Sequence, residues 1–267
     1  MNDRSLLMGV LDSFSLAGRI AVVTGGAGPQ FGSSISEALA EAGATVVVAS
    51  RDLENNRQFV AGLNERGFDT HPEALDITST ESIDDLKRRV MDRYGRVDVL
   101  VNSAVVGRGG GFDEQTPDYW AASAQGNMVG LFALCKAFVP VMAGQGSGSI
   151  INISSIYGVV ANDPGLYEET GMKQPPDYTF VKGGMINFTR YIANYYGKQG
   201  VRANCICPGG YFNEQPGPFV QRYEHRVPLG RMLDNEDLKG AVVFLASDAS
   251  GYVTGVALMV DGGWTSL

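Results

Sequence analysis

The feature of this sequence that most restricts its fold is a regular alternation between short apolar runs and longer amphipathic stretches. The apolar runs are rich in β-branched residues, which is typical of parallel strands buried on both faces. They predict strands over 20–24, 44–49, 97–101, 149–153 and 201–206, a weaker third strand over 70–75 and a last strand over 256–260. The stretches between them predict helices over 32–42, 53–66, 79–94, 117–142 and 178–199. We therefore expect an α/β fold, a doubly wound parallel sheet of about seven strands with helices on both faces.

The predicted elements follow one another without a linker, a repeat or a low-complexity segment. We therefore expect a single domain over residues 1–267, in which residues 1–16 form an N-terminal lead. Two connections rich in proline and glycine, 156–177 and 208–232, are predicted to be long loops. Long loops inside a compact domain are commonly functional, so we expect both on the substrate side of the molecule.

The charge and the cysteine content exclude several classes of function. The chain has 21 lysine and arginine residues against 29 aspartate and glutamate residues, and its net charge is -8. Such a surface repels phosphate backbones, which argues against nucleic-acid binding. The cysteines and histidines are too few for a disulfide framework or a zinc site, so we expect no metal. Because no apolar run reaches about 18 residues and the start is not a signal peptide, we expect a cytoplasmic protein outside the membrane.

A glycine-rich loop lies between the first predicted strand and the first predicted helix. It reads Thr24-Gly25-Gly26-Ala27-Gly28-Pro29-Gln30-Phe31-Gly32. Glycines let the backbone approach a pyrophosphate, and the N-terminus of a helix offers it free N–H groups. Such a loop can also be only a turn, but the strand before it and the helix after it favour nucleotide binding.

Ser50 and Arg51 end the second predicted strand, where a dinucleotide fold usually presents a group to the adenosine ribose. An acidic residue there would bind the 2′-hydroxyl of NAD, whereas Arg51 can pair with the 2′-phosphate of NADP. The alternative is a solvated arginine beside Asp52 and Glu54. We therefore expect NADP as the favoured cofactor, with NAD possible.

Tyr178 and Lys182 stand at positions i and i+4 of a predicted helix, which places both side chains on one face. A free tyrosine has a pKa near ~10, so acid–base chemistry near neutrality would need about 4 kcal/mol of stabilisation of its phenolate. A neighbouring ammonium and a cationic nicotinamide ring could supply this stabilisation. Taken alone, the pair is equally compatible with two surface residues.

Further polar residues stand at the predicted strand ends, where open α/β sheets bind their ligands. With the residues above they form an ordered series: Thr24-Gly25 with its glycines, Asp76, Asn102-Ser103-Ala104, Asn127, Ile153-Ser154-Ser155, Tyr178 with Lys182, Pro208-Gly209 and Val260-Asp261-Gly262-Gly263-Trp264. In this order the sequence resembles the short-chain dehydrogenase/reductase family, in its compact single-domain branch with a Rossmann-like fold, over nearly the whole chain. Within the family it is most similar to sugar-acid and polyol dehydrogenases of the gluconate 5-dehydrogenase kind.

The resemblance implies a catalytic role for four of these residues. Tyr178 would be the general acid/base, and Lys182 would hold the nicotinamide ribose while assisting Tyr178. Ser155 would hydrogen-bond the reacting carbonyl or hydroxyl group of the substrate. Asn127 would anchor a water that passes the proton onward.

The resemblance also implies a set of cofactor-binding residues. Asp76 and Ile77 would contact adenine, Asn102 would line the adenosine side, and Pro208-Gly209 would lie against the nicotinamide. The full expected set is Gly25, Gly28, Gln30, Phe31, Gly32, Ser50, Arg51, Asp76, Ile77, Asn102, Ala104, Tyr178, Lys182, Pro208 and Gly209.

The sequence departs from the family pattern in two places. Three residues separate Gly28 from Gly32, so the glycine loop is one residue longer than usual, and Ser33 or Ser34 would help to bind the pyrophosphate. The segment between Ser155 and Tyr178 is also longer than in most of the family. We expect the extra residues, 162–176, to wall the substrate site, as in similar long versions among sugar-related members.

The expected activity is hydride transfer between a nicotinamide cofactor and a secondary alcohol or its ketone, in a sugar, sugar acid or polyol. Two alternatives stay open, a non-catalytic dinucleotide-binding sensor and a reductase for a non-sugar ketone such as a 3-oxoacyl or steroid-like compound. An epimerase or dehydratase is disfavoured because those relatives usually carry a larger C-terminal region.

Substrate contacts and subunit contacts are less defined by the sequence. The expected substrate residues are Ser155, Tyr157, Glu168, Tyr178, Glu214 and His225, with Glu169, Gln215, Tyr223 and Arg226 as further candidates. A polyhydroxylated substrate needs several such donors and acceptors, whereas for any single residue a solvated loop surface is the alternative. The apolar C-terminal residues 256–264 suggest a subunit contact, and the resemblance implies a homo-oligomer, a tetramer or a dimer.

Overall fold

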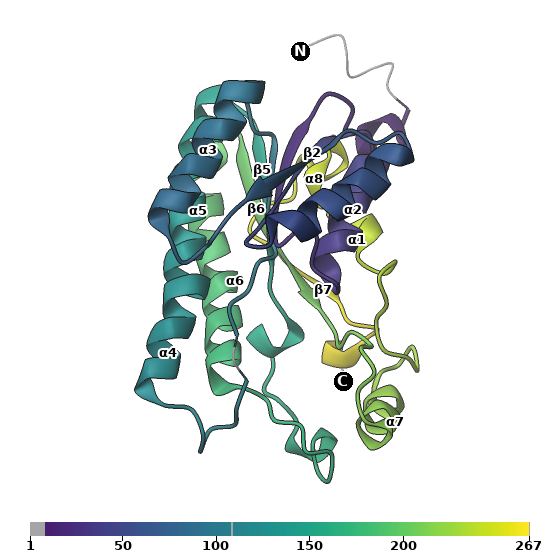
Figure 1. Ribbon diagram of the computed structural model, residues 1–267. Coiled ribbons are helices and arrows are strands. Elements are labelled where there is room, and N and C mark those ends of the chain that lie inside the picture. Colours follow the sequence, from purple (N-terminus) through teal and green to yellow (C-terminus); the bar gives the residue numbers. More distant parts are fainter. Residues whose placement is uncertain (1–8, 108, 267) are drawn as a thin grey trace.

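The computed structural model describes residues 9–107 and 109–266 of the chain. The strands are β1 (Ile20–Thr24), β2 (Thr45–Ser50), β3 (Thr70–Ala74), β4 (Val99–Asn102), β5 (Gly148–Ile153), β6 (Val201–Pro208) and β7 (Ala257–Val260). They form one seven-stranded parallel sheet in the order β3-β2-β1-β4-β5-β6-β7 (Figure 1). The predicted Rossmann-like α/β fold is thereby confirmed. Because the order reverses between β1 and β4, the loops after these strands diverge and open a crevice at their carboxyl ends.

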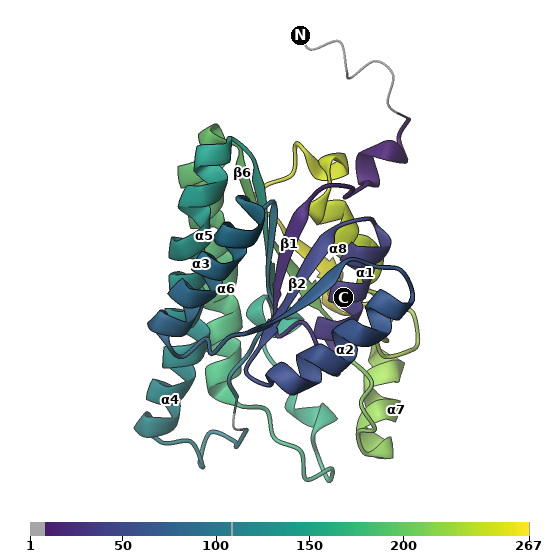
Figure 2. The ribbon, with the colours of Figure 1, turned by 45° about the horizontal axis from the view of Figure 1, so that its top comes forward.

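Helices cover both faces of this sheet. One layer consists of α1 (Phe31–Glu41), α2 (Leu53–Glu65) and α8 (Lys239–Ala246), and the other of α3 (Thr80–Tyr94), α5 (Leu131–Gln145) and α6 (Pro176–Tyr196). Figures 1 and 2 show the two layers on opposite sides of the strands. Val22 and Val23 of β1 lie in different cores, since successive residues of a strand alternate between its faces.

The helix predicted over 117–142 contains a widened turn. It consists of α4 (Pro117–Ala124), a π-helical turn (Gln125–Gly130) and α5. Glycines let this turn approach neighbouring loops, because a Cβ on Gly126 would lie 2.4 Å from the side chain of Val106. A Cβ on Gly130 would lie 2.2 Å from the carbonyl oxygen of Ile77. The turn therefore brings Asn127 close to the loops that follow β3 and β4.

The same helical segment is long and apolar. By length and composition, residues 117–145 could cross a membrane, with a mean hydropathy of 1.5 in an 18-residue window. Of that window, 56% is buried inside the described fold. Polar residues, Gln125, Asn127 and Lys136 among them, interrupt this segment, and the buried core helices of soluble proteins have a similar length and composition.

Two helices lie where the sequence predicted none. α7 (Gly217–Arg226) falls inside the expected loop over 208–232, and α8 falls between that loop and β7. Pro218 stands in the first turn of α7. Proline is compatible with that position, because the first N–H groups of a helix have no partner. The other expected loop, 156–177, is irregular up to the start of α6 apart from short 3-10 turns at Ile156–Gly158 and Pro164–Leu166.

Candidate active site

A cleft of about 520 Å³ opens at the carboxyl ends of the strands. It lies between the loops that follow β1 and β4, with the end of β2 on one side and α6 on the other. The expected cofactor residues that line it are Gly25, Gly28, Gln30, Phe31, Gly32, Ser50, Arg51, Ile77, Ala104, Tyr178 and Lys182. Asp76, Asn102, Pro208 and Gly209 lie outside its lining.

The glycine loop forms a cradle that tolerates no side chain at its closest approaches. Gly25 has a φ of 67°, and a Cβ on Gly32 would lie only 1.9 Å from the carbonyl oxygen of Gly25. A Cβ on Gly25 itself would lie 3.0 Å from the Cα of Ala104. The loop and the start of α1 thus bring bare backbone and helical N–H groups to one wall of the cleft. This arrangement fits the pyrophosphate of a dinucleotide.

The additional residue of this loop is accommodated at its outer tip. Pro29 and Gln30 are exposed, and α1 begins directly after them with Phe31. The Phe31 ring packs edge-on against Tyr211, with 5.4 Å between the ring centres. The amide of Ser33 donates to the carbonyl oxygen of Gly28 at 3.0 Å. That N–H group is therefore already bonded within the loop, which disfavours the pyrophosphate contact expected of it.

The end of β2 presents a cation toward the adenosine side of the cleft. Arg51 is exposed, whereas the Ser50 hydroxyl donates to Oδ1 of Asn56 at 2.7 Å. Hydrogen bonds from Thr78 hold the pKa of the Asp76 carboxyl below its usual range, and the Arg51 charge adds to this effect. Asp76 is therefore an anion close to Arg51, and its neighbour Ile77 supplies the apolar surface of the cleft.

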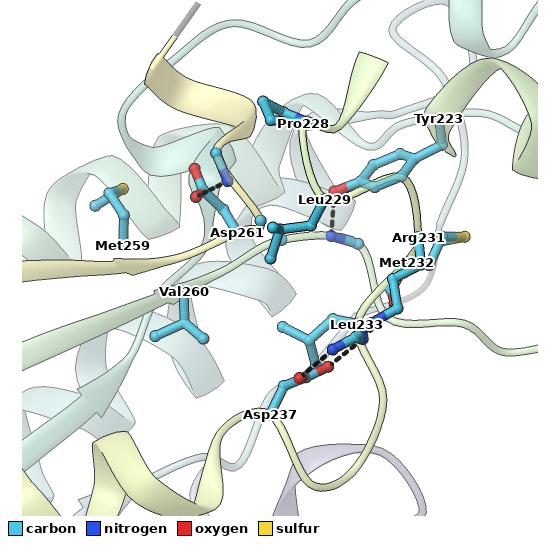
Figure 3. Close-up of a pocket in the computed structure, with 14 residues that line it drawn as sticks. Tyr223, Pro228, Leu229, Arg231, Met232, Leu233, Asp237, Met259, Val260 and Asp261 are labelled. Atoms are coloured by element: carbon cyan, nitrogen blue, oxygen red, sulfur yellow. Dashed lines mark hydrogen bonds and ion pairs between the residues drawn. The ribbon is translucent and has the colours of Figure 1, made fainter. Parts of the chain in front are cut away.

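Asn102 and Gly209 support the site from outside the cleft. The Asn102 side chain is buried, and its Nδ2 donates to Oδ1 of Asn152 at 2.8 Å, which ties β4 to β5. Gly209 lines a separate hollow of about 460 Å³ beside β7 and the C-terminal end of the described chain (Figure 3). These two residues shape the strand ends rather than the cleft wall.

Tyr178 and Lys182 lie together on α6, as their spacing predicts. The Lys182 Nζ is 5.4 Å from the centre of the Tyr178 ring and donates to the carbonyl oxygen of Ile153 at 2.7 Å. Burial lowers the pKa of Lys182 to about 8. Burial also raises the pKa of Tyr178, and a hydrogen bond with the Ser155 side chain opposes this rise. In the protein by itself, the pKa of Tyr178 is therefore raised rather than lowered.

Ser155 completes this group at the end of β5. Its Oγ accepts the amide N–H of Tyr157 at 3.1 Å, and its side chain lies near enough to Tyr178 to lower the pKa of that tyrosine. The preceding Ser154 donates its hydroxyl to the carbonyl oxygen of Lys182 at 2.9 Å. The bond from Ser154 fixes the end of β5 against α6, close to Tyr178.

Asn127 does not line the cleft but contacts a residue that does. Its Oδ1 accepts the amide N–H of Val106 at 2.8 Å, and its Nδ2 donates to the Ser123 hydroxyl at 3.1 Å. Val106 lines the cleft, so Asn127 holds the loop after β4 in place. The sequence analysis did not single out the further lining residues Ala49, Leu75, Val105 and Val106. The sequence could have predicted them, because each lies at or just beyond the carboxyl end of a predicted strand, where such sheets bind their ligands.

The expected substrate residues separate into a buried and an exposed group. Tyr157 is only 8% exposed, and its hydroxyl is 3.0 Å from that of Tyr167. The side chains of Glu168, Glu214 and His225 are exposed and form no hydrogen bond with the described residues. The structure thus brings Tyr157 close to Tyr178 and leaves the other three on the outer surface.

Arg226 and Arg222 are engaged by the segment 162–176. Arg226 pairs with Asp163 and lies over the Trp264 ring, 4.6 Å from its centre. Arg222 donates to the carbonyl oxygen of Glu168. These contacts dock the segment on α7 and occupy Arg226, which the sequence suggested as a substrate contact.

Comparisons with known proteins agree with this geometry. A family model described as enoyl-(acyl carrier protein) reductase matches residues 26–265. The chain is 32% identical over 260 residues to a gluconate 5-dehydrogenase of Gluconobacter oxydans, covering 95% of this chain and 97% of that protein. It is 31% identical over 252 residues to a 3-oxoacyl-(acyl-carrier-protein) reductase of Thermotoga maritima, covering 93% and 98%. The crystal structure of a gluconate 5-dehydrogenase from Burkholderia cenocepacia, in complex with NADP and tartrate, superposes with a TM-score of 0.88 at 30% identity, covering 97% of this chain and 100% of that one.

Proposed function

The chain belongs to the short-chain dehydrogenase/reductase family of oxidoreductases, and we propose that it transfers a hydride between a nicotinamide cofactor and a secondary alcohol or its ketone. The observation that carries this proposal is that Tyr178 and Lys182 line one end of a glycine-walled cleft, with Ser155 beside Tyr178. A sensor without catalysis would not require all three side chains in contact. We therefore favour an enzyme over a binding protein.

In this proposal each side chain has a defined task. When bound, the nicotinamide ring supplies or accepts the hydride. The Tyr178 hydroxyl donates a proton to the carbonyl oxygen of a ketone, or takes one from an alcohol, and Ser155 holds the same oxygen by a second hydrogen bond. Lys182 holds the ribose hydroxyls with its ammonium and favours the Tyr178 phenolate. Asn127 keeps the loop after β4 in position.

In this proposal the cofactor contacts four regions of the chain, which lie in the cleft or beside it. The glycine loop and the start of α1 would bind the pyrophosphate, and Ile77 with Asp76 would meet the adenine. Pro208-Gly209 would lie against the nicotinamide. Arg51 would pair with a 2′-phosphate, so we propose NADP as the preferred cofactor. The NADP in the related Burkholderia crystal structure supports this choice.

We propose a sugar acid or polyol as the substrate, on the strength of the gluconate 5-dehydrogenases among the relatives. An apolar ketone is the second candidate. Tyr157, Leu166 and Tyr167 form an aromatic and apolar cluster beside Tyr178, which favours such a substrate. A relative that reduces 3-oxoacyl groups supports it as well.

A spectrophotometric screen tests the activity and both candidates. Purified protein is assayed with NADP or NADPH, and with NAD or NADH, against polyols, sugar acids, keto-sugars and 3-oxoacyl thioesters. In the best reaction found, Tyr178→Phe is expected to lower kcat by about 10²–10⁴-fold, the usual contribution of a general acid.

The matched readout for this variant is the dissociation constant of NADPH, which is expected to change less than about twofold because Tyr178→Phe keeps the ring. A variant with the kcat of the wild-type protein would remove Tyr178 from the mechanism. A panel in which no substrate class is turned over with either cofactor would contradict the proposed function.

A further inference from the structure

Tyr223 lies on α7, and its hydroxyl accepts the backbone N–H of Gly210, two residues beyond β6 (Figure 3). The sequence suggested this tyrosine as a substrate contact. It is only 2% exposed, and its hydroxyl is already engaged by the backbone, which disfavours a direct substrate contact. A buried hydroxyl with a backbone partner is instead a fixed point in the fold.

An aromatic stack holds the ring of Tyr223 in place. The Trp264 ring lies parallel to it at 4.5 Å between centres and 18° between planes. Trp264 is itself buried and contacts the guanidinium of Arg226, which pairs with Asp163. Trp264 packs on the ring, and Arg226 links Trp264 to Asp163. These contacts fix the position of the Tyr223 hydroxyl, which therefore accepts the Gly210 N–H in one geometry.

The backbone at Gly209 and Gly210 is shaped to receive this ring. A Cβ on Gly210 would lie 2.8 Å from the Tyr223 ring, and one on Gly209 would lie 3.0 Å from its hydroxyl. On the opposite side, the carbonyl oxygen of Gly210 accepts the amide of Leu233 at 2.9 Å. The N–H and the carbonyl group of Gly210 thus both have a partner, and the path of the backbone here depends on Tyr223.

We propose that Tyr223 is a positioning residue that sets the path of the turn 208–210, and through this turn the placement of the nicotinamide end of the cofactor. The inference rests on the proposed function, in which Pro208-Gly209 lie against the nicotinamide. Tyr223 touches neither cofactor nor substrate. It acts only through the Gly210 amide and the packing of the turn.

The test compares two probes that differ by the nicotinamide ring. NADPH contains this ring, and 2′-phospho-ADP-ribose lacks it. Tyr223→Phe removes the hydroxyl and keeps the ring on Trp264. We expect the affinity for NADPH to fall about fivefold, as the loss of one buried hydrogen bond would give, while the affinity for 2′-phospho-ADP-ribose changes less than about twofold. In the best reaction of the substrate screen, kcat is expected to fall about tenfold, because hydride transfer depends on placement within about 1 Å.

Ser149→Ala is the matched control. Its hydroxyl donates to the carbonyl oxygen of Leu245 at 2.7 Å, at the other end of the sheet, so this variant also loses one buried bond from a side chain to the backbone. We expect a similar loss of thermal stability, with the ratio of the two affinities and kcat unchanged. If Ser149→Ala changed the ratio of the affinities for NADPH and 2′-phospho-ADP-ribose as much as Tyr223→Phe does, general destabilisation would explain the effect of Tyr223→Phe.

Gly210→Ala probes the same contact from the turn and keeps the test open if Tyr223→Phe fails to fold. Its Cβ would displace the ring, so we expect the same selective loss of NADPH affinity. The losses of the two single variants should not add in the double variant, because both break one contact. Equal weakening of both probes, or of neither, in both variants would overturn the role of Tyr223. If the wild-type protein bound neither probe, the proposed function would fail instead.

Discussion

At the scale of single residues, the buried ammonium of Lys182 lowers the stability of the folded protein but is needed for the proposed function. Burial lowers its pKa to about 8, whereas an unfolded chain holds a lysine pKa near ~10.4. Between these two values the unfolded chain binds more protons than the folded chain, so stability rises with pH across this window. Below the folded pKa the full cost of the buried ammonium is present.

Lys182→Met is therefore expected to stabilise the protein at pH 7 while abolishing most of its activity. The buried charge costs about 3 kcal/mol by its pKa shift, and the lost bond to the Ile153 carbonyl returns about 1 kcal/mol. Denaturant unfolding at pH 7 and pH 10 measures the effect. The advantage of the variant should shrink toward pH 10, and an advantage independent of pH would contradict a charged Lys182 in the fold.

Arg51 decides the cofactor in our proposal. Arg51→Ala is expected to weaken NADPH binding by about 10-fold or more, the worth of a charge-assisted hydrogen bond, and to change NADH binding less than about twofold. Fluorescence titration of both cofactors measures this difference. Arg57→Ala is the control, since Arg57 is a similarly exposed arginine on α2 that lies outside the cleft lining. Equal losses for NADPH and NADH in Arg51→Ala would refute pairing with the 2′-phosphate.

The sequence predicts which residues form the site better than it predicts their burial and their pKa values. Tyr178, Ser155 and the glycines belong to motifs whose order and position at strand ends are visible in the chain. The raised pKa of Tyr178 depends on burial by β6 and α6, and the burial of Tyr223 depends on Trp264 far along the sequence. Neither environment is encoded in a local pattern.

At the scale of elements, strands were predicted more accurately than the later helices. β1 has the predicted bounds, because its apolar run is buried on both faces and ends at the glycine loop. α7 and α8 were missed for two reasons. The prolines that begin α7 read as loop residues, and α8 is too short and too rich in valine to show a helical period.

The segment 162–176 is docked on two sides. Asp163 and the Glu168 carbonyl bind arginines of α7, and Lys173 pairs with Glu114 in the loop after β4. The segment therefore bridges the two walls that flank Tyr178. This arrangement supports its expected role in limiting which substrates reach the site.

Replacing residues 163–172 by a short glycine–serine linker is expected to change substrate selectivity. The ratio of kcat/KM between two substrates of the screen should shift by about fivefold or more, since the wall contributes on the order of 1 kcal/mol to discrimination. NADPH affinity should be unchanged. Asp163→Asn is the control, because it weakens the ion pair between the segment and Arg226 but leaves the segment in the chain. It shows whether selectivity depends on that ion pair or on the segment itself. Unchanged selectivity in the replacement variant would make the segment mere surface.

At the scale of the whole molecule, one helical face is apolar and uncovered by the described chain. Phe132 of α5 is 53% exposed and Tyr195 of α6 is 63% exposed, and Met128, Phe180 and Tyr191 are also exposed. An apolar hollow of about 260 Å³ lies within this face. We propose that a second copy of the chain covers it, which makes the protein a homo-oligomer.

Phe132→Glu is expected to reduce the oligomer to a smaller species, because a charge at the centre of an apolar interface is left without a partner. Sedimentation velocity measures the mass, and circular dichroism checks that helicity is retained. Leu11→Glu adds the same charge at a residue that is 80% exposed but outside this face, and should leave the mass unchanged. A wild-type protein that sediments as a monomer would contradict the proposal.

The widened turn at Gln125–Gly130 has a consequence for how this chain can be altered. One residue added to a helix rotates everything after it by about 100° about the axis, because a turn holds about 3.6 residues. The widened turn accommodates an extra residue without this rotation, so the inward-facing side chains of α5, Phe138 among them, stay in phase with the sheet. The same change made within α5 would turn the residues beyond it out of phase. A local irregularity thus sets the angular registration of the following fifteen-residue helix.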